Sequence, residues 1–384
     1  MKAILVCEQD PNDRIVRSGV PYSIYQQLKK RCDDVIWIKP EIKGWTNKLV
    51  TLPLRLYYKL MIGLRYNPCG RNVLLSRMMA KDIERKISDI DYDFVFSTDT
   101  LNIAFLKTAK PIFVRIDAIF QSALNYYYFK VPSLSRLQGI NVENKALNNL
   151  TKIFSPSQWI MDELVKYRVD FDVKGKVSIV ETGANLLNNE VNYKVKHFSI
   201  DKSLNMLFIG IDAKRKGIDV AYKTLLLLRS TYYLNATLTI VGGKPDDYIL
   251  EDKNVVYVGM LDKNKEDQRI KFYKQYENAD LFIFPTKAEF HGIVNCEAAA
   301  YGLPIFSYNT GGVPSYVIDG VNGYVFPLSN NEENFAKKIY ECIKFGQMDY
   351  LSLGSRKLFE DKFNWDIWGE KIMAEIFKIV KKQR

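Results

Sequence analysis

The sequence predicts an α/β protein with two doubly wound parallel sheets, and three observations lead to this fold class. The chain has 384 residues, which is long for one domain and sufficient for two that each bury a core. Short apolar runs alternate with helical patterns twice along the chain, as in parallel sheets whose crossovers are helices. Residues 184–203, which are polar and poorly periodic, separate the two series and are the expected linker.

The first series predicts a six-stranded sheet in the N-terminal half. Helical patterns such as residues 22–31 and 143–150 lie between the apolar runs, and Ser157 is the expected cap of a helix that starts near Trp159. The expected strands are residues 2–7, 35–38, 94–97, 112–116, 153–155 and 177–180.

The second series predicts another parallel sheet, with a helix that ends near residues 225–228. Residues 365–380 then form an amphipathic helix, because apolar side chains recur at helical spacing from Trp368 to Ile379. The expected strands are residues 206–210, 236–241, 255–258, 281–284 and 323–326.

Composition favours an ordered, reduced, cytoplasmic protein without a metal centre. Hydrophobic residues make up 47% of the chain and aromatic residues 13%. The five cysteines are scattered without a Cys-x-x-Cys spacing, and only His197 and His291 could serve a His-rich metal site. The N-terminal apolar run is too short for a signal sequence, and no uncharged run approaches the ~20 residues of a membrane span.

The segment after the expected strand at residues 281–284 predicts an anion site. A loop that holds Glu289 leads to Gly292, which opens a helix over residues 294–301 that Gly302 and Pro304 stop. The first N–H groups of that helix, at Gly292, Ile293 and Val294, have no helical carbonyl to bond. They lie at the carboxyl end of the strand, where the helix dipole favours a phosphate by roughly 0.3–1 kcal/mol.

Two carboxylates flank this helix start. If the segment from Glu289 to Glu297 were wholly helical, they would lie about 12 Å apart along the axis, at ~1.5 Å rise per residue. That separation fits two sugars joined through a diphosphate.

These residues resemble a known family. Glu289 and Glu297 with seven residues between them, followed by Ala-Tyr-Gly-Leu-Pro and Thr-Gly-Gly-Val-Pro, resemble the retaining GT-B glycosyltransferases of family 4, or glycosyl transferases group 1. The resemblance implies two Rossmann-like domains that face a cleft: residues 1–190 for the acceptor and 200–365 for the donor, with a helix at about 366–384 that crosses back. It also implies that Glu289 contacts the transferred sugar and that Glu297 binds the ribose hydroxyls.

A basic loop follows the expected strand at residues 206–210. Clustered cations at such a turn can stabilise the charge that grows on a departing diphosphate. The family has an Arg directly after the first Gly, here Gly210, and a Lys six residues after it; Lys216 matches the Lys. Ile211 departs from the Arg, so Arg215 is the candidate substitute. The alternative is a solvated basic turn.

Three further residues are weaker candidates. Gly19, in the first loop, suits either a close donor contact or a plain turn. Asp117 resembles the Asp of a subgroup with an Asp-Ala-x-Phe segment and could contact the donor sugar or orient the acceptor hydroxyl, or simply cap a turn. His291 suits a supporting or sugar contact. The Asp-x-Asp at residues 91–93 precedes a strand on the edge opposite the cleft, so no metal ligands are expected there.

The formal net charge of +11 is concentrated in part in residues 41–80, where seven Lys and Arg face the single acid Glu41. Trp, Tyr, Leu, Met and Ile are interleaved with the cations, which suits an anionic membrane surface or a lipid-phosphate acceptor. The alternative is a helical insertion whose apolar side belongs to the core.

The sequence therefore predicts a retaining, metal-independent hexosyltransferase without a cofactor. It would move a sugar from a nucleotide-diphosphate donor to a glycan or lipid-linked acceptor, in the cytoplasm or on the inner face of the membrane, in cell-surface polysaccharide synthesis. A hydrolysing sugar-nucleotide epimerase or a phosphorylase on the same fold is the alternative. No nucleic-acid partner is expected, because no known nucleic-acid module is present.

Overall fold

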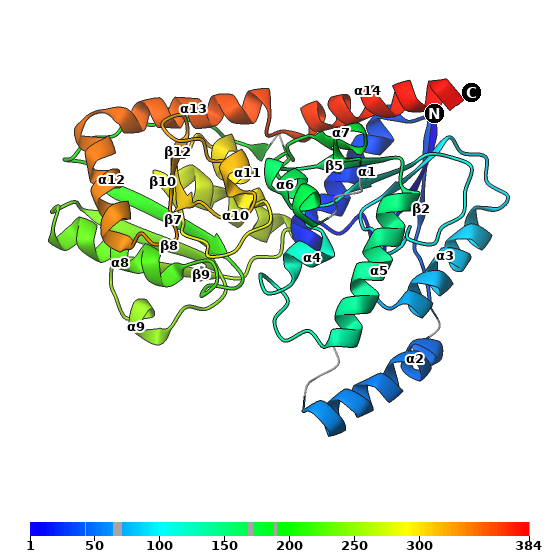
Figure 1. Ribbon diagram of the computed structural model, residues 1–384. Helices are drawn as coiled ribbons and strands as arrows, with labels where there is room; N and C mark the ends of the chain where they lie inside the picture. Colours follow the sequence, from blue (N-terminus) through cyan, green and yellow to red (C-terminus); the bar gives the residue numbers. More distant parts are fainter. Residues whose placement is uncertain (43, 64–70, 168–171, 188–189, 384) are drawn as a thin grey trace. The chain divides into compact units, whose positions relative to one another are not determined.

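The computed structural model describes residues 1–42, 44–63, 71–167, 172–187 and 190–383, and the chain forms two compact units (Figure 1). Unit 1 comprises Met1–Val180 and Gly369–Arg384, and unit 2 comprises Glu181–Trp368. Each unit has its own sheet and its own buried core, so each is described by itself.

Unit 1 contains six parallel strands in the order β2-β1-β3-β4-β5-β6. The strands are β1 (Lys2–Val6), β2 (Asp34–Ile38), β3 (Phe94–Ser97), β4 (Ile112–Arg115), β5 (Lys152–Ser155) and β6 (Val177–Ile179). The helical elements are η1 (Val16–Gly19), α1 (Val20–Arg31), α2 (Gly44–Tyr57), η2 (Tyr58–Ile62), α3 (Val73–Ile87), α4 (Phe120–Ala123), α5 (Ser133–Asn149), α6 (Gln158–Tyr167) and α7 (Val173–Lys176).

The central strands of unit 1 are apolar except at their last residues, as is typical of parallel strands buried on both faces. Every residue of β3 and β4 is buried, and the Phe94 and Phe113 rings meet edge to face with centroids 5.7 Å apart. The strand ends therefore carry the polar groups of this unit, which places chemistry at the edges of the sheet.

Unit 2 contains a second set of six parallel strands, in the order β12-β11-β10-β7-β8-β9. The strands are β7 (Leu204–Gly210), β8 (Ala236–Gly242), β9 (Val255–Gly259), β10 (Leu281–Phe284), β11 (Ile305–Tyr308) and β12 (Gly323–Phe326). The helical elements are α8 (Ile218–Ser230), α9 (Asp247–Leu250), α10 (Glu266–Asn278), α11 (Ile293–Ala300), η4 (Val313–Ser315), α12 (Glu332–Lys344), α13 (Gln347–Asp361) and α14 (Trp365–Gln383).

The predicted fold class is confirmed, with three local differences. Strand β11 was not predicted, because its short run after Pro304 is interrupted by Ser307. The expected cap Ser157 is wrong: its hydroxyl is buried and makes no hydrogen bond to the described residues, whereas Ser155 Oγ bonds the Ser157 backbone. The start of the expected linker belongs to unit 2, where Ala184 packs into a core cluster.

Helix α14 contains residues of both units. Its first turn lies in unit 2, where Trp365 Nε1 donates to Asn185 Oδ1 at 2.8 Å. Its later turns lie in unit 1, where Glu375 accepts from Lys152 and from Ser178, each at 2.8 Å. Ile376 is fully buried on the same stretch, so the end of the chain is part of the core of unit 1.

Truncating Ile376 to Ala should lower the free energy of unfolding by about 2–5 kcal/mol, because it removes buried methyl groups and leaves a cavity. The adjacent Phe377 has 54% of its surface exposed, so Phe377→Ala should change stability by only ~0.5 kcal/mol. Urea unfolding of the two variants measures the difference. Equal midpoints would show that α14 does not stabilise unit 1.

Candidate active site

The candidate site in unit 2 lies where the strand order reverses. Strand β7 pairs with β8 on one side and with β10 on the other, so the chain leaves β7 and β10 toward opposite edges of the sheet. Ligands of open α/β sheets bind outside the carboxyl ends of strands at such a point. The loop after β7 carries Gly210, Arg215 and Lys216, and the loop after β10 carries Glu289, so these predicted residues converge.

The two loops touch through a glycine. Gly217 directly precedes α8 with a φ of +81°, which L side chains rarely adopt. A Cβ on Gly217 would lie 2.0 Å from the carbonyl oxygen of Pro285, in the other loop. The amide of Lys287 also donates to the carbonyl of Arg215 at 2.9 Å. Backbone contact, and not only side-chain contact, therefore holds the loops together.

Lys216 and Glu289 form a buried ion pair across these loops. Their side chains are 14% and 11% exposed, and the ammonium also lies 4.9 Å from the centroid of the Phe284 ring. Burial lowers the pKa of the Lys216 ammonium, the Arg215 guanidinium lowers it further, and Asp212 opposes this. The facing carboxylate of Glu289 favours the charged form of the ammonium, in opposition to burial.

The side chain of Arg215 is held by hydrogen bonds to two other residues. Its Nη1 donates to the carbonyl of Ala288 at 2.7 Å, and its Nε donates to Asp212 at 3.2 Å. Ile211, at the position where the family has Arg, is 71% exposed. Lys214 is exposed and pairs with Asp246 at 3.3 Å. Arg215 and Lys216 therefore contact the loop after β10. Lys214 instead pairs with Asp246, which does not belong to that loop.

Helix α11 starts close to Glu289 of the ion pair. Gly292 precedes it with a φ of +73°, and a Cβ there would lie 2.7 Å from Asn295 Nδ2 and 3.2 Å from Glu289 Cγ. Ile293 is buried and Val294 is partly exposed. His291 is buried, with its ring 5.7 Å from that of Tyr316. The unpaired N–H groups of the helix start thus lie beside Glu289, as a phosphate site requires.

Glu297 lies inside α11 and is 1% exposed. Its Oε2 accepts from the Tyr276 hydroxyl at 2.7 Å, and its Oε1 accepts from Lys263 Nζ at 3.3 Å. Burial, and then the adjacent carboxylate, raise the pKa of Tyr276, which keeps its hydroxyl a donor. The expected 12 Å axial separation from Glu289 does not apply, because the helix begins only at Ile293.

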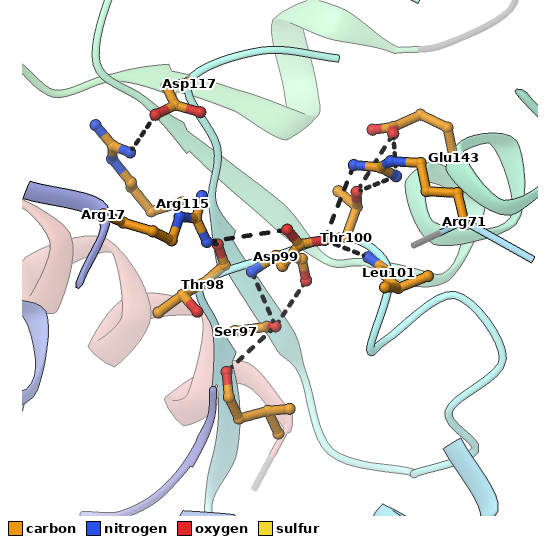
Figure 2. A network of polar contacts seen from close by, with 11 residues as sticks. Arg17, Arg71, Ser97, Thr98, Asp99, Thr100, Leu101, Arg115, Asp117 and Glu143 are labelled. Carbon is orange, nitrogen blue, oxygen red and sulfur yellow. Dashed lines mark hydrogen bonds and ion pairs between the residues drawn. The ribbon is translucent and has the colours of Figure 1, made fainter. Parts of the chain in front are cut away.

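Asp117 and Gly19 lie in unit 1. Asp117 follows β4, is 29% exposed and accepts from Arg115 Nη1 at 3.2 Å (Figure 2). Gly19 precedes α1 with a φ of +84° and follows two residues, Arg17 and Ser18, that also have positive φ. Asp117 therefore lies just past the carboxyl end of β4, and Gly19 lies in the segment between β1 and α1, as the sequence predicted.

Lys263 and Tyr276 were missed by sequence reasoning. Lys263 lies in the loop after β9 and Tyr276 lies on α10, both more than twenty residues before Glu297, and no spacing in the sequence connects them to it. Only the order of the strands and the packing of α10 bring them together.

Solved structures share the architecture of the whole chain. Sucrose-phosphate synthase from Thermosynechococcus elongatus superposes with a TM-score of 0.71 at 14% identity, covering 100% of both chains. Anabaena HepE in complex with UDP-glucose superposes with a TM-score of 0.67 at 14% identity, covering 98% of this chain and 100% of that one. Two all-parallel sheets and these neighbours define a GT-B protein.

The sequence comparisons match part of the chain to a family. Residues 190–349 match the family described as Glycosyl transferases group 1. An uncharacterised glycosyltransferase of Methanocaldococcus jannaschii is 24% identical over 228 residues, 58% of each chain. The capsular polysaccharide biosynthesis glycosyltransferase CapM of Staphylococcus aureus is 25% identical over 190 residues, 48% of each. The chain spans about half the length of the curated relatives it matches.

Replacing Gly217 by Ala should destabilise unit 2 and separate the two loops, since the new Cβ would meet the Pro285 carbonyl. Gly346→Ala is the matched control, because Gly346 also directly precedes a helix at positive φ but a Cβ there would meet nothing within 4 Å. The control should cost about 1–2 kcal/mol from backbone strain alone, and Gly217→Ala should cost more. Thermal unfolding compares them; equal losses would contradict the contact.

Proposed function

We propose that the protein is a retaining, metal-independent glycosyltransferase that moves a hexosyl group from a nucleotide-diphosphate sugar to a glycan or lipid-linked acceptor. The observation that carries this proposal is the pairing of Lys216 with Glu289 beside the start of α11. A cation, a carboxylate and unpaired N–H groups at one point suit a sugar diphosphate. Unit 2 would bind the donor, and unit 1 would bind the acceptor.

The leaving diphosphate would be stabilised by Lys216, by Arg215 and by the helix start at Gly292, Ile293 and Val294. In the described residues no group of three or more His, Cys, Asp and Glu is placed to hold a metal ion. In this proposal the charge on the diphosphate is balanced by Lys216, Arg215 and the helix start.

Glu289 would position the transferred sugar, with His291 supporting the same loop, and Glu297 would bind the ribose. Binding would release Glu289 from Lys216, because the diphosphate offers the ammonium a stronger anion. Same-face attack guided by the leaving group would then retain the configuration of the sugar. Gly19 and Asp117 of unit 1 would contribute contacts to the donor sugar or the acceptor.

Two comparisons support the finer parts of this proposal. The structural neighbour that binds UDP-glucose supports a nucleotide-sugar donor, and the relative named for capsular polysaccharide biosynthesis supports a cell-surface polysaccharide as the product. Thermal shift with a panel of UDP, GDP and ADP sugars tests the proposal, because a bound donor raises the unfolding midpoint. If no sugar nucleotide raised it, the proposed function would be wrong.

Lys216→Ala should lower kcat by roughly 100- to 1000-fold, because its interaction grows as the glycosidic bond breaks. Lys216→Arg should recover only part of the rate, since a planar guanidinium does not place its charge where an ammonium would. Lys214→Ala is the matched control on the same turn and should change little. Steady-state kinetics with the donor found in the panel measures all three. Near-wild-type turnover of a folded Lys216→Ala variant would remove this residue from the mechanism.

We further propose that unit 1 binds an anionic membrane surface through α2 and η2. Most apolar side chains of these elements are exposed, which favours an interface over a core insertion, and Lys48, Arg55 and Lys59 are exposed among them. Lys43 and Arg65 of the predicted stretch lie outside the described residues. No described helix is long and apolar enough to span a bilayer. The exposed apolar residues are Trp45, Leu49, Leu52, Leu56, Tyr57, Leu60 and Met61.

Changing Lys48, Arg55 and Lys59 together to Gln should weaken binding to anionic vesicles, because each cation near such a surface contributes about 1 kcal/mol. Binding of the wild type should fall as salt rises. The exposed Lys337, Lys344 and Lys357 of unit 2, changed to Gln together, are the matched control and should leave binding unchanged. Vesicle sedimentation measures this; equal binding to neutral and anionic vesicles would contradict the role of the cations.

A further inference from the structure

A second polar site lies in unit 1, at its own point of strand reversal (Figure 2). Strand β1 pairs with β2 on one side and β3 on the other, so the loops after β1 and β3 leave toward opposite edges. This is the geometry at which open α/β sheets bind ligands. Thr98, Asp99 and Thr100 follow β3 there, and the sequence patterns singled out none of them.

The loop after β1 reaches across this point through Arg17. The guanidinium of Arg17 donates to the carbonyl of Thr98 at 2.8 Å. Arg17 and the next residue, Ser18, have φ values of 48° and 57°, which non-glycine residues rarely adopt. Such strained backbone is concentrated at ligand sites, because the surrounding contacts must hold it in place.

Arg71 comes from a different segment of the chain, and its side chain is held by three contacts. Its guanidinium pairs with Glu143 at 2.5 Å and donates to Thr100 Oγ1 at 2.9 Å, and it lies 5.5 Å from the centroid of the Phe120 ring. Glu143 is fully buried, so the pair is shielded from solvent. Arg71 is therefore held in one position before any ligand arrives.

Asp99 lies between the two guanidinium groups. Its side chain is 34% exposed, and its Oδ1 accepts from the amide of Leu101 at 2.7 Å. The nearest nitrogens of Arg17 and Arg71 lie 3.9 and 3.8 Å from its oxygens, close enough for ion pairing but too far for hydrogen bonds. A hydroxyl beside these groups could accept from a guanidinium and donate its O–H to the carboxylate.

The charges of the cluster favour a neutral ligand. Arg17, Arg71 and Arg115 face four carboxylates. Burial raises the pKa of two of these, Glu8 and Glu143, which lowers the negative charge of the cluster. An anion would meet the carboxylates and a cation would meet the guanidinium groups. A hydroxyl both donates and accepts, so it suits the two kinds of group at once. The four carboxylates are Glu8, Asp99, Asp117 and Glu143.

We propose that Asp99, Arg17 and Arg71 bind neighbouring hydroxyls of an uncharged sugar, which is the acceptor of the transfer reaction. The role as acceptor rests on the proposed function; binding of a neutral sugar at this site does not. Asp99 accepts from one hydroxyl while the guanidinium groups donate to its neighbour, and Asp117 lies at the end of the adjacent strand β4.

Saturation-transfer NMR on the full chain tests this with the methyl glycosides of glucose, galactose, mannose and N-acetylglucosamine, and with inorganic phosphate and glucose 6-phosphate. At least one neutral glycoside should bind. Asp99→Asn and Arg17→Gln should each weaken that binding roughly tenfold or more, because each removes a charged hydrogen-bond partner. Asn at position 99 can still accept from the Leu101 amide, so the loop should be kept. Circular dichroism and the unfolding midpoint establish that each variant is folded.

Two controls separate this inference from the proposed function. Asp91→Asn removes an exposed carboxylate that pairs with Lys2 outside the cluster, and it should leave glycoside binding unchanged. Lys216→Ala should lower the rate of transfer from the sugar nucleotide and leave glycoside binding intact. The inference is overturned if no neutral glycoside binds, if the phosphorylated probes bind in preference, or if Asp99→Asn and Arg17→Gln bind as the wild type does. If the wild-type chain bound a neutral glycoside but no sugar nucleotide, only the proposed function would be overturned.

Discussion

The buried ion pair between Lys216 and Glu289 is the interaction on which the arrangement of unit 2 depends. It forms only because β7 and β10 are neighbours and because Gly217 lets the two loops touch. Removing one partner of a buried pair leaves an uncompensated charge, which is strongly destabilising. The pair therefore helps to keep both loops in place.

Each unit has a candidate site at the carboxyl edge of its own sheet, and the two sites differ in the charges of their side chains. In unit 2 the reversal point combines Lys216 and Arg215 with the start of a helix, which suits an anion. In unit 1 the reversal point alternates guanidinium groups with carboxylates around Asp99, which suits hydroxyls. One topology can thus present two chemically different sites, because the strand order sets where a ligand binds and the loop residues set which ligand binds.

The sequence was sufficient wherever the information was local. Continuous apolar runs predicted most strands because buried parallel strands are apolar throughout, and Gly292 predicted the start of α11 because it precedes a run of helix formers. Strand β11 was not predicted, because a run of four residues that contains a Ser is too short to show a hydrophobic periodicity. The partners of Glu297 could not be predicted, because Lys263 and Tyr276 meet it only through tertiary packing. Asp99 was missed for the same reason: its arginine neighbours come from two other segments.

The exposed apolar surface of α2 and η2 has a kinetic consequence for a lipid-linked acceptor. A protein held at a bilayer by this helix would meet such an acceptor by diffusion in two dimensions, so the quantity that saturates it is the number of acceptor molecules per unit area of membrane. Confinement to one surface raises the effective concentration without any new contact. Dilution of the acceptor with inert lipid would then slow the reaction even when the bulk amount of acceptor stays the same.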